Sequence, residues 1–220
     1  MTIAKSDNDV TSTPTGVRYE PVNEDGALAL LKNSDLSPEE IEGISKGSAV
    51  RSSRKVRMAM AAHSRTPRRI ALRLIRELYT FDLVQFSQMS SAPAGLKRAA
   101  DDLLVTRLSS ITLGERISLA RRASPQVVSA LLADQEPSVW QAALENPRLT
   151  EAAVIRALQR GATSAFVEAV CHHATWSPRA DIRIALLRNA HTPLAHALEF
   201  ARRLPPTQLR DVLLAAAGAG

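Results

Sequence analysis

From Val50 onward, short apolar segments with helical spacing alternate with turns that contain Thr, Ser or Pro. Each turn combines a capping side chain or a bend with a residue suited to the first turn of a helix. The turns lie at Thr66-Pro67, Ala92-Pro93, Ser124-Pro125, Thr150-Glu151, Ser177-Pro178 and Pro205-Pro206. Successive turns are 26, 32, 26, 27 and 28 residues apart. A spacing this regular predicts a repeated unit of two helices.

Three segments support this prediction because they align column by column: 56–66, 140–150 and 182–192. The fourth residue is always Ala and the last is always Thr. We expect the small Ala to let adjacent helices approach and the Thr to cap the next helix. The copies are 84 and 42 residues apart, so the last one matches across half a unit. Either both helices of a pair follow one pattern, or the segments converge on a generic helix–turn–helix pattern.

The stretches Leu-Glu-Asn-Pro-Arg-Leu-Thr-Glu at 144–151 and Ala-Leu-Leu-Arg-Asn-Ala-His-Thr-Pro at 185–193 carry a family resemblance. The chain resembles bacterial leucine-rich repeat variant proteins and the wider HEAT-like group over residues 51–216. The resemblance implies an all-α fold, an α-solenoid of about six antiparallel helix pairs with a concave groove. Such motifs specify a fold and hardly constrain function. Some members carry an N-terminal iron–sulfur module held by several cysteines, which is not expected here because the one cysteine is Cys171.

The predicted pairs occupy 51–79, 80–108, 113–134, 137–160, 163–188 and 192–216. Residues 1–26 are predicted to be a disordered acidic leader, because they contain few apolar residues. Residues 27–50 are predicted to be a short helical segment. Within it, Ser37, Pro38 and Glu40 form a capping-box pattern that predicts a helix from Pro38 to about Ser45.

Charge is distributed unevenly along the 220 residues, whose formal net charge is +6. Residues 1–50 hold four Lys/Arg and nine Asp/Glu, a net charge of −5, while residues 51–220 hold 24 and 13, a net charge of +11. An acidic leader before a basic body indicates either a self-shielding tail or an anionic partner. The single cysteine and the lack of a bilayer-spanning apolar segment predict a cytoplasmic protein.

The strongest local feature is a basic cluster from Arg51 to Arg76, which contains nine Lys/Arg and no acidic residue. Helical spacing places Arg65, Arg69, Arg73 and Arg76 on one face, opposite an apolar stripe. One interpretation is a site for a phosphate or an acidic peptide. The alternative is a solvated face at the end of the stack, or one neutralised by the acidic leader.

A second candidate surface comprises Trp176, Arg179, Asp181 and Arg183. HEAT-like alkylpurine DNA glycosylases use aromatic, Asp and Arg residues in a concave groove, and these four supply the same residue types. Trp176 in a groove would be a binding anchor, whereas Trp176 before Ser177-Pro178 is also typical of a hydrophobic staple. Trp140 occupies a column held by Val56 and Ile182, which favours core packing.

The run Cys171-His172-His173, with His191 and His196 downstream, contains metal-ligand types. Adjacent histidines on a helix point about 100° apart, and no Cys-x-x-Cys or His-Glu-x-x-His spacing exists. We therefore expect no metal and no cofactor. Common enzyme signatures are also missing: the chain has no Gly-x-Ser-x-Gly, no glycine-rich phosphate loop and no paired-carboxylate motif.

Two functions remain open at this point. The first is a non-enzymatic scaffold that recognises another protein through its concave groove or its basic N-terminal end. The alternative is a DNA- or RNA-binding solenoid, with glycosylase activity as its narrower form; its binding to duplex DNA would fall steeply with salt.

Overall fold

The computed structural model describes residues 23–217, and within that range the chain is helical, with fifteen α-helices, one 3-10 helix and no strand. The all-α prediction is therefore confirmed for this part of the chain. In chain order the elements are α1 (Glu24–Leu30), α2 (Pro38–Ser45), α3 (Ser48–Ser52), α4 (Arg54–Ala62), α5 (Arg68–Arg76), α6 (Thr80–Gln88), α7 (Ala94–Arg107), η1 (Leu108–Ser110), α8 (Leu113–Arg122), α9 (Pro125–Leu131), α10 (Pro137–Leu144), α11 (Glu151–Gln159), α12 (Ser164–His172), α13 (Ala180–Leu187), α14 (Leu194–Arg202) and α15 (Pro206–Ala217). None of these helices is long and apolar enough to cross a bilayer.

Helices α4 to α15 follow the six predicted pair ranges, two helices to each range, and α15 ends one residue beyond the last range. The N-terminal boundary differs from the prediction, since α1 begins at Glu24, inside the predicted 1–26 leader. Asn23 caps α1 through its side chain, and Glu24 and Asp25 lie in the first turn, where acidic groups favour a helix. Two acidic residues of the predicted disordered leader thus stabilise the start of α1. Residues 1–22 of the predicted leader lie outside the described residues.

Several helix starts follow the sequence closely. Helix α2 spans Pro38 to Ser45 as predicted, and Ser37 and Glu40 form a complete capping box. Helix α8 has a second capping box between Thr112 and Glu115. The Glu115 carboxylate accepts from the Thr112 backbone N–H and from its hydroxyl, and these bonds lower the pKa of Glu115.

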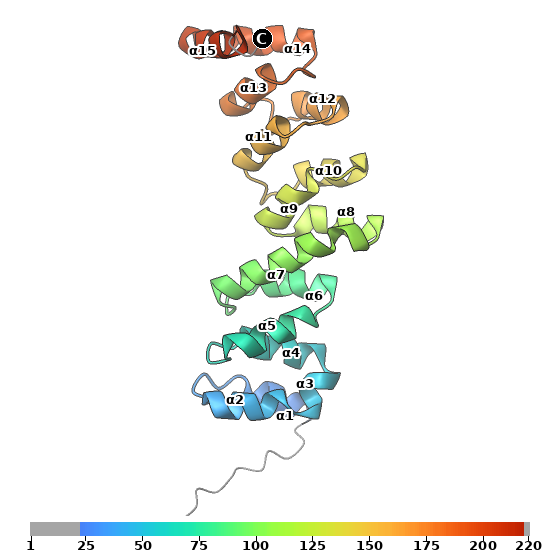
Figure 1. Ribbon diagram of the computed structural model, residues 1–220, viewed down its shortest axis with the longest axis vertical. Helices are drawn as coiled ribbons and strands as arrows, with labels where there is room; N and C mark the ends of the chain where they lie inside the picture. The colour runs from blue at the N-terminus through green and yellow to red at the C-terminus, as the bar shows by residue number, and fades with distance from the viewer. Residues whose placement is uncertain (1–22, 218–220) are drawn as a thin grey trace, which may run out of the picture.

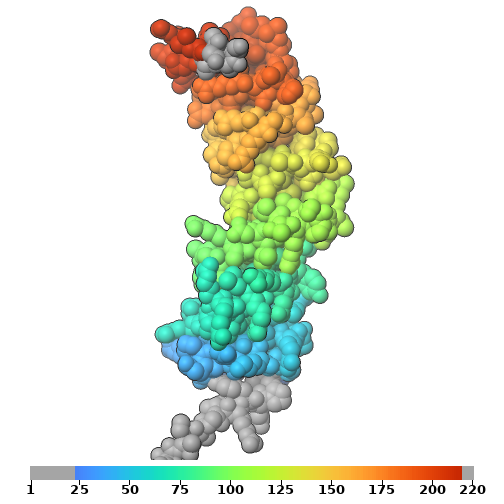
Figure 2. All heavy atoms as spheres, viewed as in Figure 1, coloured from blue at the N-terminus to red at the C-terminus, as the bar shows by residue number. Residues whose placement is uncertain are grey.

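The helices succeed one another along the long axis, from α1 at the bottom of Figure 1 to α15 at the top. In one row, α4 contacts α6, α8 contacts α10, and α10 contacts α12. In the other row, α5, α7, α9, α11 and α13 each contact the next. The rows also pack against each other within α4–α5, α6–α7 and α8–α9. The filled outline is an elongated body with a shallow recess on its left edge, in the yellow part (Figure 2).

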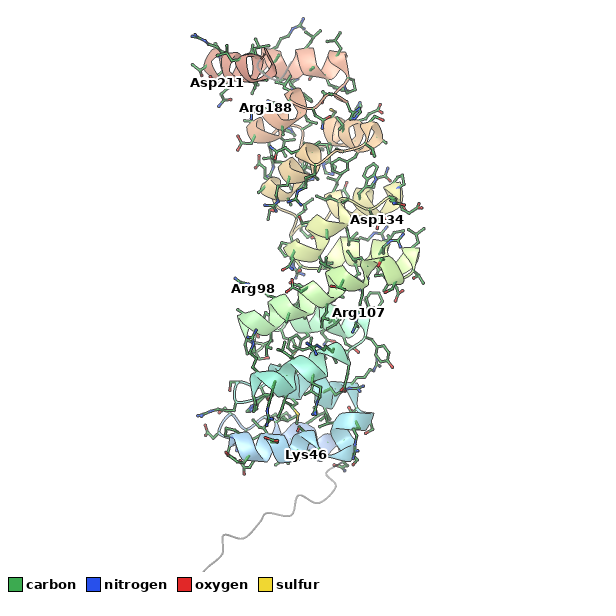
Figure 3. The ribbon with its side chains drawn as sticks, viewed as in Figure 1. Lys46, Arg98, Arg107, Asp134, Arg188 and Asp211 are labelled. Atoms are coloured by element: carbon green, nitrogen blue, oxygen red, sulfur yellow. The ribbon has the colours of Figure 1, made fainter. Side chains whose placement is uncertain are left out.

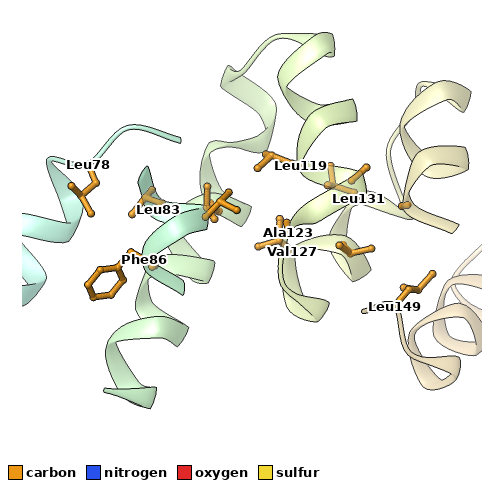
Figure 4. Packing of buried hydrophobic residues seen from close by; sticks show 14 of the residues in the cluster. Leu78, Leu83, Phe86, Leu119, Ala123, Val127, Leu131 and Leu149 are labelled. Carbon is orange, nitrogen blue, oxygen red and sulfur yellow. The ribbon is translucent and has the colours of Figure 1, made fainter. Parts of the chain in front are cut away.

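Apolar side chains from successive pairs form one continuous core along this axis. Figure 4 shows part of this core, with Leu78, Leu83 and Phe86 at one side and Leu119 and Val127 further along it. Burying a side chain of this size contributes about 1.5–3 kcal/mol. A single pair of short helices has too little apolar surface of its own, so each pair depends on the contacts with its neighbours.

The Thr column has a different role from the predicted one. The hydroxyls of Thr66 and Thr192 donate backward, to the carbonyls of Met60 and Leu186, each at 2.6 Å. Helices α5 and α14 instead begin after Pro67 and Pro193, which make no side-chain cap. These threonines therefore close the preceding helix, because its last carbonyls have no partner within the helix.

Thr150 makes no capping hydrogen bond, although it is the N-cap residue of α11. The reason is a shift of one residue in the turn. The backbone N–H of Leu149 bonds to Asn146 O, just as Thr66 N–H bonds to His63 O. Leu149 therefore occupies the position that Thr66 holds, and it is buried. The alignment that placed Thr150 in this column is one residue out of register here.

The sequence comparison missed a second recurring position, which lies in the turn after a helix and is occupied by Asn or His. Asn146 accepts from Arg148 N–H at 2.7 Å and donates to Ala120 O, in α8, at 2.7 Å. Asn189 makes the same two kinds of bond, accepting from His191 N–H at 2.9 Å and donating to Leu158 O at 2.7 Å. Each side chain therefore fixes its own turn and ties it to a helix 26 or 31 residues earlier.

Asn146→Ala should lower the free energy of unfolding by about 2–3 kcal/mol, because it leaves a buried carbonyl and a turn N–H without partners. Asn146 is only 3% exposed, so water does not replace the lost bonds. Thr150→Ala is the matched control and should change stability by less than about 0.5 kcal/mol. Denaturant unfolding measures both values, and equal losses would contradict this assignment.

Gly161, which follows α11, has the only positive φ among the described residues, +86°. A Cβ at this position would meet no atom within 4 Å, so the cost of Gly161→Ala is conformational alone. We expect a loss of about 1–2 kcal/mol. Gly114 lies inside α8, and its Cβ would likewise meet nothing within 4 Å. Gly114→Ala should therefore raise stability by about 0.5–1 kcal/mol, and thermal unfolding of the two variants should shift in opposite directions.

Candidate binding surfaces

The basic face, defined as Arg65, Arg69, Arg73 and Arg76, lies at the N-terminal end of the molecule. All four side chains are exposed. Arg65 lies in the turn before α5, while the other three project from the helix itself. Lys46, labelled near the bottom of Figure 3, marks the neighbouring end of α2.

One carboxylate already binds this face. The Arg69 guanidinium donates to the Glu42 carboxylate of α2 at 2.7 Å, and Glu42 also pairs with Lys46 at 3.7 Å. A small hollow of about 200 Å³ lies between Arg69 and Arg73 of α5 and the end of α2. Within the described part of the chain, Arg65, Arg73 and Arg76 have no carboxylate within ion-pair distance. The face therefore keeps most of its positive charge.

Three other members of the basic cluster form ion pairs with acidic residues of the same chain. Arg54 pairs with Asp82 and Arg57 with Glu77, each at 3.7 Å. Lys55 pairs with Glu24 at 3.8 Å, so one residue of the predicted leader does shield the cluster. The acidic partners come mainly from neighbouring helices.

Trp176 is an interior residue rather than an exposed groove residue. It is 3% exposed, and its indole N–H donates to Leu144 O at 2.9 Å. Arg179 lies over the ring, with its guanidinium carbon 4.7 Å from the centroid, and pairs with Glu151 at 3.0 Å. The interpretation as a binding anchor is therefore wrong, because the only polar atom of Trp176 and nearly all its surface are used within the fold.

The remaining predicted groove residues do not converge on one point. Arg183 donates to Ser177 O at 2.9 Å and is half-buried, while Asp181 is exposed in the first turn of α13. Trp140 is buried and packs edge-on against Phe166, with centroids 5.4 Å apart, as its column predicts.

The histidines come together only in pairs. The rings of His172 and His196 are 4.6 Å apart between α12 and α14, and His173 lies 3.2 Å from the Glu145 carboxylate. In the described ranges no three His, Cys, Asp or Glu side chains are grouped as a metal ion would need.

Burial raises the pKa of the Cys171 thiol to about 11, and the nearby Glu168 carboxylate adds to the rise. The nucleophilic thiolate is therefore scarce at neutral pH, and Cys171 is buried in the core.

Cys171 should react with a disulfide reagent such as DTNB at pH 8 at least about 100-fold more slowly than the same thiol in guanidinium-unfolded protein. The time course of absorbance measures the reaction. Equal native and unfolded rates would show that this thiol is accessible and ionisable.

A further surface, which the sequence analysis missed, follows the turns that join one pair to the next. Three hollows of about 390, 520 and 320 Å³ adjoin one another there. The first two share Ala133 and Asp134, and the last two share Gly161 and Ala162. We call this line of hollows the inter-pair groove. Asp134 and Arg107 are labelled on the right side of the molecule in Figure 3.

The lining of the inter-pair groove is positive overall, with four arginines and two acidic residues. Arg116 pairs with Asp134 at 2.9 Å, so these two charges cancel. Arg156, Arg160 and Arg188 are exposed and have no carboxylate within ion-pair distance among residues 23–217. The sequence signal was the Arg156–Arg160 spacing of four beside Gly161, which marks one helix face ending at a turn.

Comparison with known proteins gives no further assignment: no protein-family model, no curated protein and no solved structure matches this chain.

Proposed function

We propose that the protein is a HEAT-like α-solenoid and acts as a non-enzymatic scaffold that binds an acidic region of another protein on its basic face. The row contacts support the solenoid, because α5, α7, α9, α11 and α13 pack one against the next, and α4–α6, α8–α10 and α10–α12 pack in the same way in the other row. The ion pair between Arg69 and Glu42 carries the partner assignment. In this ion pair the basic face binds a carboxylate of the same chain, and three further exposed guanidinium groups lie beside it.

A protein partner fits the surface better than a nucleic acid does. Single strands and flipped bases are bound by aromatic side chains that stack on them, yet both tryptophans are buried, and the exposed Tyr79 ring already has the Arg54 guanidinium over it, 5.6 Å from the centroid. Of the 24 basic residues in 51–220, 22 are Arg, whose planar group binds carboxylates through two parallel bonds. Glycosylase activity loses its support because Trp176, the aromatic residue of the predicted groove, is 3% exposed and lies in the interior.

The basic face is tested with Arg73→Glu/Arg76→Glu, which leaves Arg69 opposite Glu42. Exposed ion pairs are worth about 0–1 kcal/mol each, so the fold should keep its helical signal and melting temperature. Partner proteins recovered from nuclease-treated host lysate on immobilised protein should fall at least about tenfold, as quantified by mass spectrometry.

Arg121→Glu/Arg122→Glu is the matched control, since it makes the same charge change on exposed residues of α8. It should recover the same proteins as the wild type. Equal recovery on all three baits would rule out the basic face as the binding site. Recovery that disappears after nuclease treatment, together with salt-sensitive binding to duplex DNA, would favour the nucleic-acid alternative instead.

A further inference from the structure

The central hollow of the inter-pair groove, about 520 Å³, lies between the α9–α10 and α11–α12 turns. Its lining includes the apolar residues Leu132, Ala153, Ala157 and the Trp140–Phe166 pair, and Gln135 and Thr163 are among its polar residues. A volume of this size is within the range of ligand sites and holds a large apolar side chain. An apolar wall that ends at exposed guanidinium groups favours a ligand with both an apolar and an anionic group.

Two arginines line this hollow at the C-terminal end of α11. Arg156 lies in the last turn of the helix, and Arg160, four residues later, is its C-cap residue. The acidic residue of the hollow, Asp134, is already engaged, because its carboxylate pairs with Arg116 and accepts from Glu136 N–H at 3.0 Å. The rim charge is thus not balanced within the hollow, and it is complementary to a carboxylate.

The central hollow shares lining residues with a neighbouring hollow on each side, so the three hollows follow one another along the turns. Layers of packed helices are about 8–10 Å apart, which makes three hollows about 25–30 Å long. An extended chain advances about 3.3 Å per residue, so about eight or nine residues span this length. Arg188 in the third hollow places another positive charge further along the same path.

We propose that the inter-pair groove is a second binding site, which takes an extended protein segment with a large apolar residue next to acidic ones. The apolar side chain enters the central hollow, and the carboxylates contact Arg156 and Arg160. A nucleic-acid strand fits less well, because Trp140 and Phe166 form an interior wall and offer no exposed ring for stacking. This site is separate from the basic face and does not depend on the function proposed for it.

The probe is a fluorescein-labelled peptide of about nine residues in which Leu and Phe alternate with Asp and Glu. Fluorescence anisotropy with the full chain should show saturable binding. Arg156→Ala/Arg160→Ala should weaken binding at least about tenfold by removing the rim charge. Ala165→Trp should weaken it similarly while keeping the charge, because exposed Ala165 lines the central hollow. Peptides with Asn and Gln for the acids, or Ser for the apolar residues, should bind at least about tenfold more weakly.

Two controls locate the peptide. Arg121→Ala/Arg122→Ala removes the same charge outside the groove and should stay within about twofold of the wild type. Arg73→Glu/Arg76→Glu should also bind as the wild type does. Loss of binding in either control, or no saturable binding to the wild type, would overturn the proposal. It would equally fail if an oligothymidine of matched length displaced the peptide and depended on Arg156 and Arg160.

Discussion

The carbonyl groups at the ends of short helices are the constraint on which the structure depends. Apart from α7 and α15, every α-helix described has ten residues or fewer, and the last four carbonyls of any helix lack a partner within it. Side chains from other pairs supply the donors. His63 lies 2.9 Å from Asn33 O, and Trp176 and Asn189 donate to Leu144 and Leu158. These bonds join residues 30 to 32 positions apart, about one pair length, so one set of contacts both closes the helices and orders the stack.

The same requirement changes the meaning of the basic composition. Arg107 donates to Leu78 O and Arg76 O, each at 2.7 Å, and Arg148 donates to Arg122 O at 3.0 Å. These guanidinium groups donate hydrogen bonds to main-chain carbonyls at helix ends, a role that does not require their positive charge. The net charge of residues 51–220 therefore overstates the positive charge that is available to a binding partner. Among residues 23–217, the arginines whose side chains bond neither to main-chain carbonyls nor to carboxylates include Arg65, Arg73 and Arg76 of the basic face and Arg156, Arg160 and Arg188 of the inter-pair groove.

Much of the fold could be predicted from local sequence patterns, because helix starts and turns depend on residues that lie close together in the sequence. Helical periodicity and Ser37 with Glu40 place α2 correctly, and the turn spacing places the six pair ranges. The role of Thr150 was predicted wrongly because a one-residue shift within a turn leaves the sequence columns unchanged. Trp176 and the groove depend on which pairs lie side by side. Such contacts between residues 26 to 34 positions apart carry no local signal, so an interior tryptophan looks like an exposed one.

The two candidate surfaces also differ in the source of their binding energy. The basic face offers guanidinium groups with little apolar surface, so attraction there is electrostatic and screened over about 8 Å at physiological ionic strength. The groove adds apolar walls to a smaller charge, and burial of apolar surface does not weaken as ions accumulate. Under the two binding proposals above, a segment in the groove should stay bound at salt concentrations that release a partner from the face. The face would then act mainly on the association rate, through attraction over distance, and the groove on specificity, through its shape.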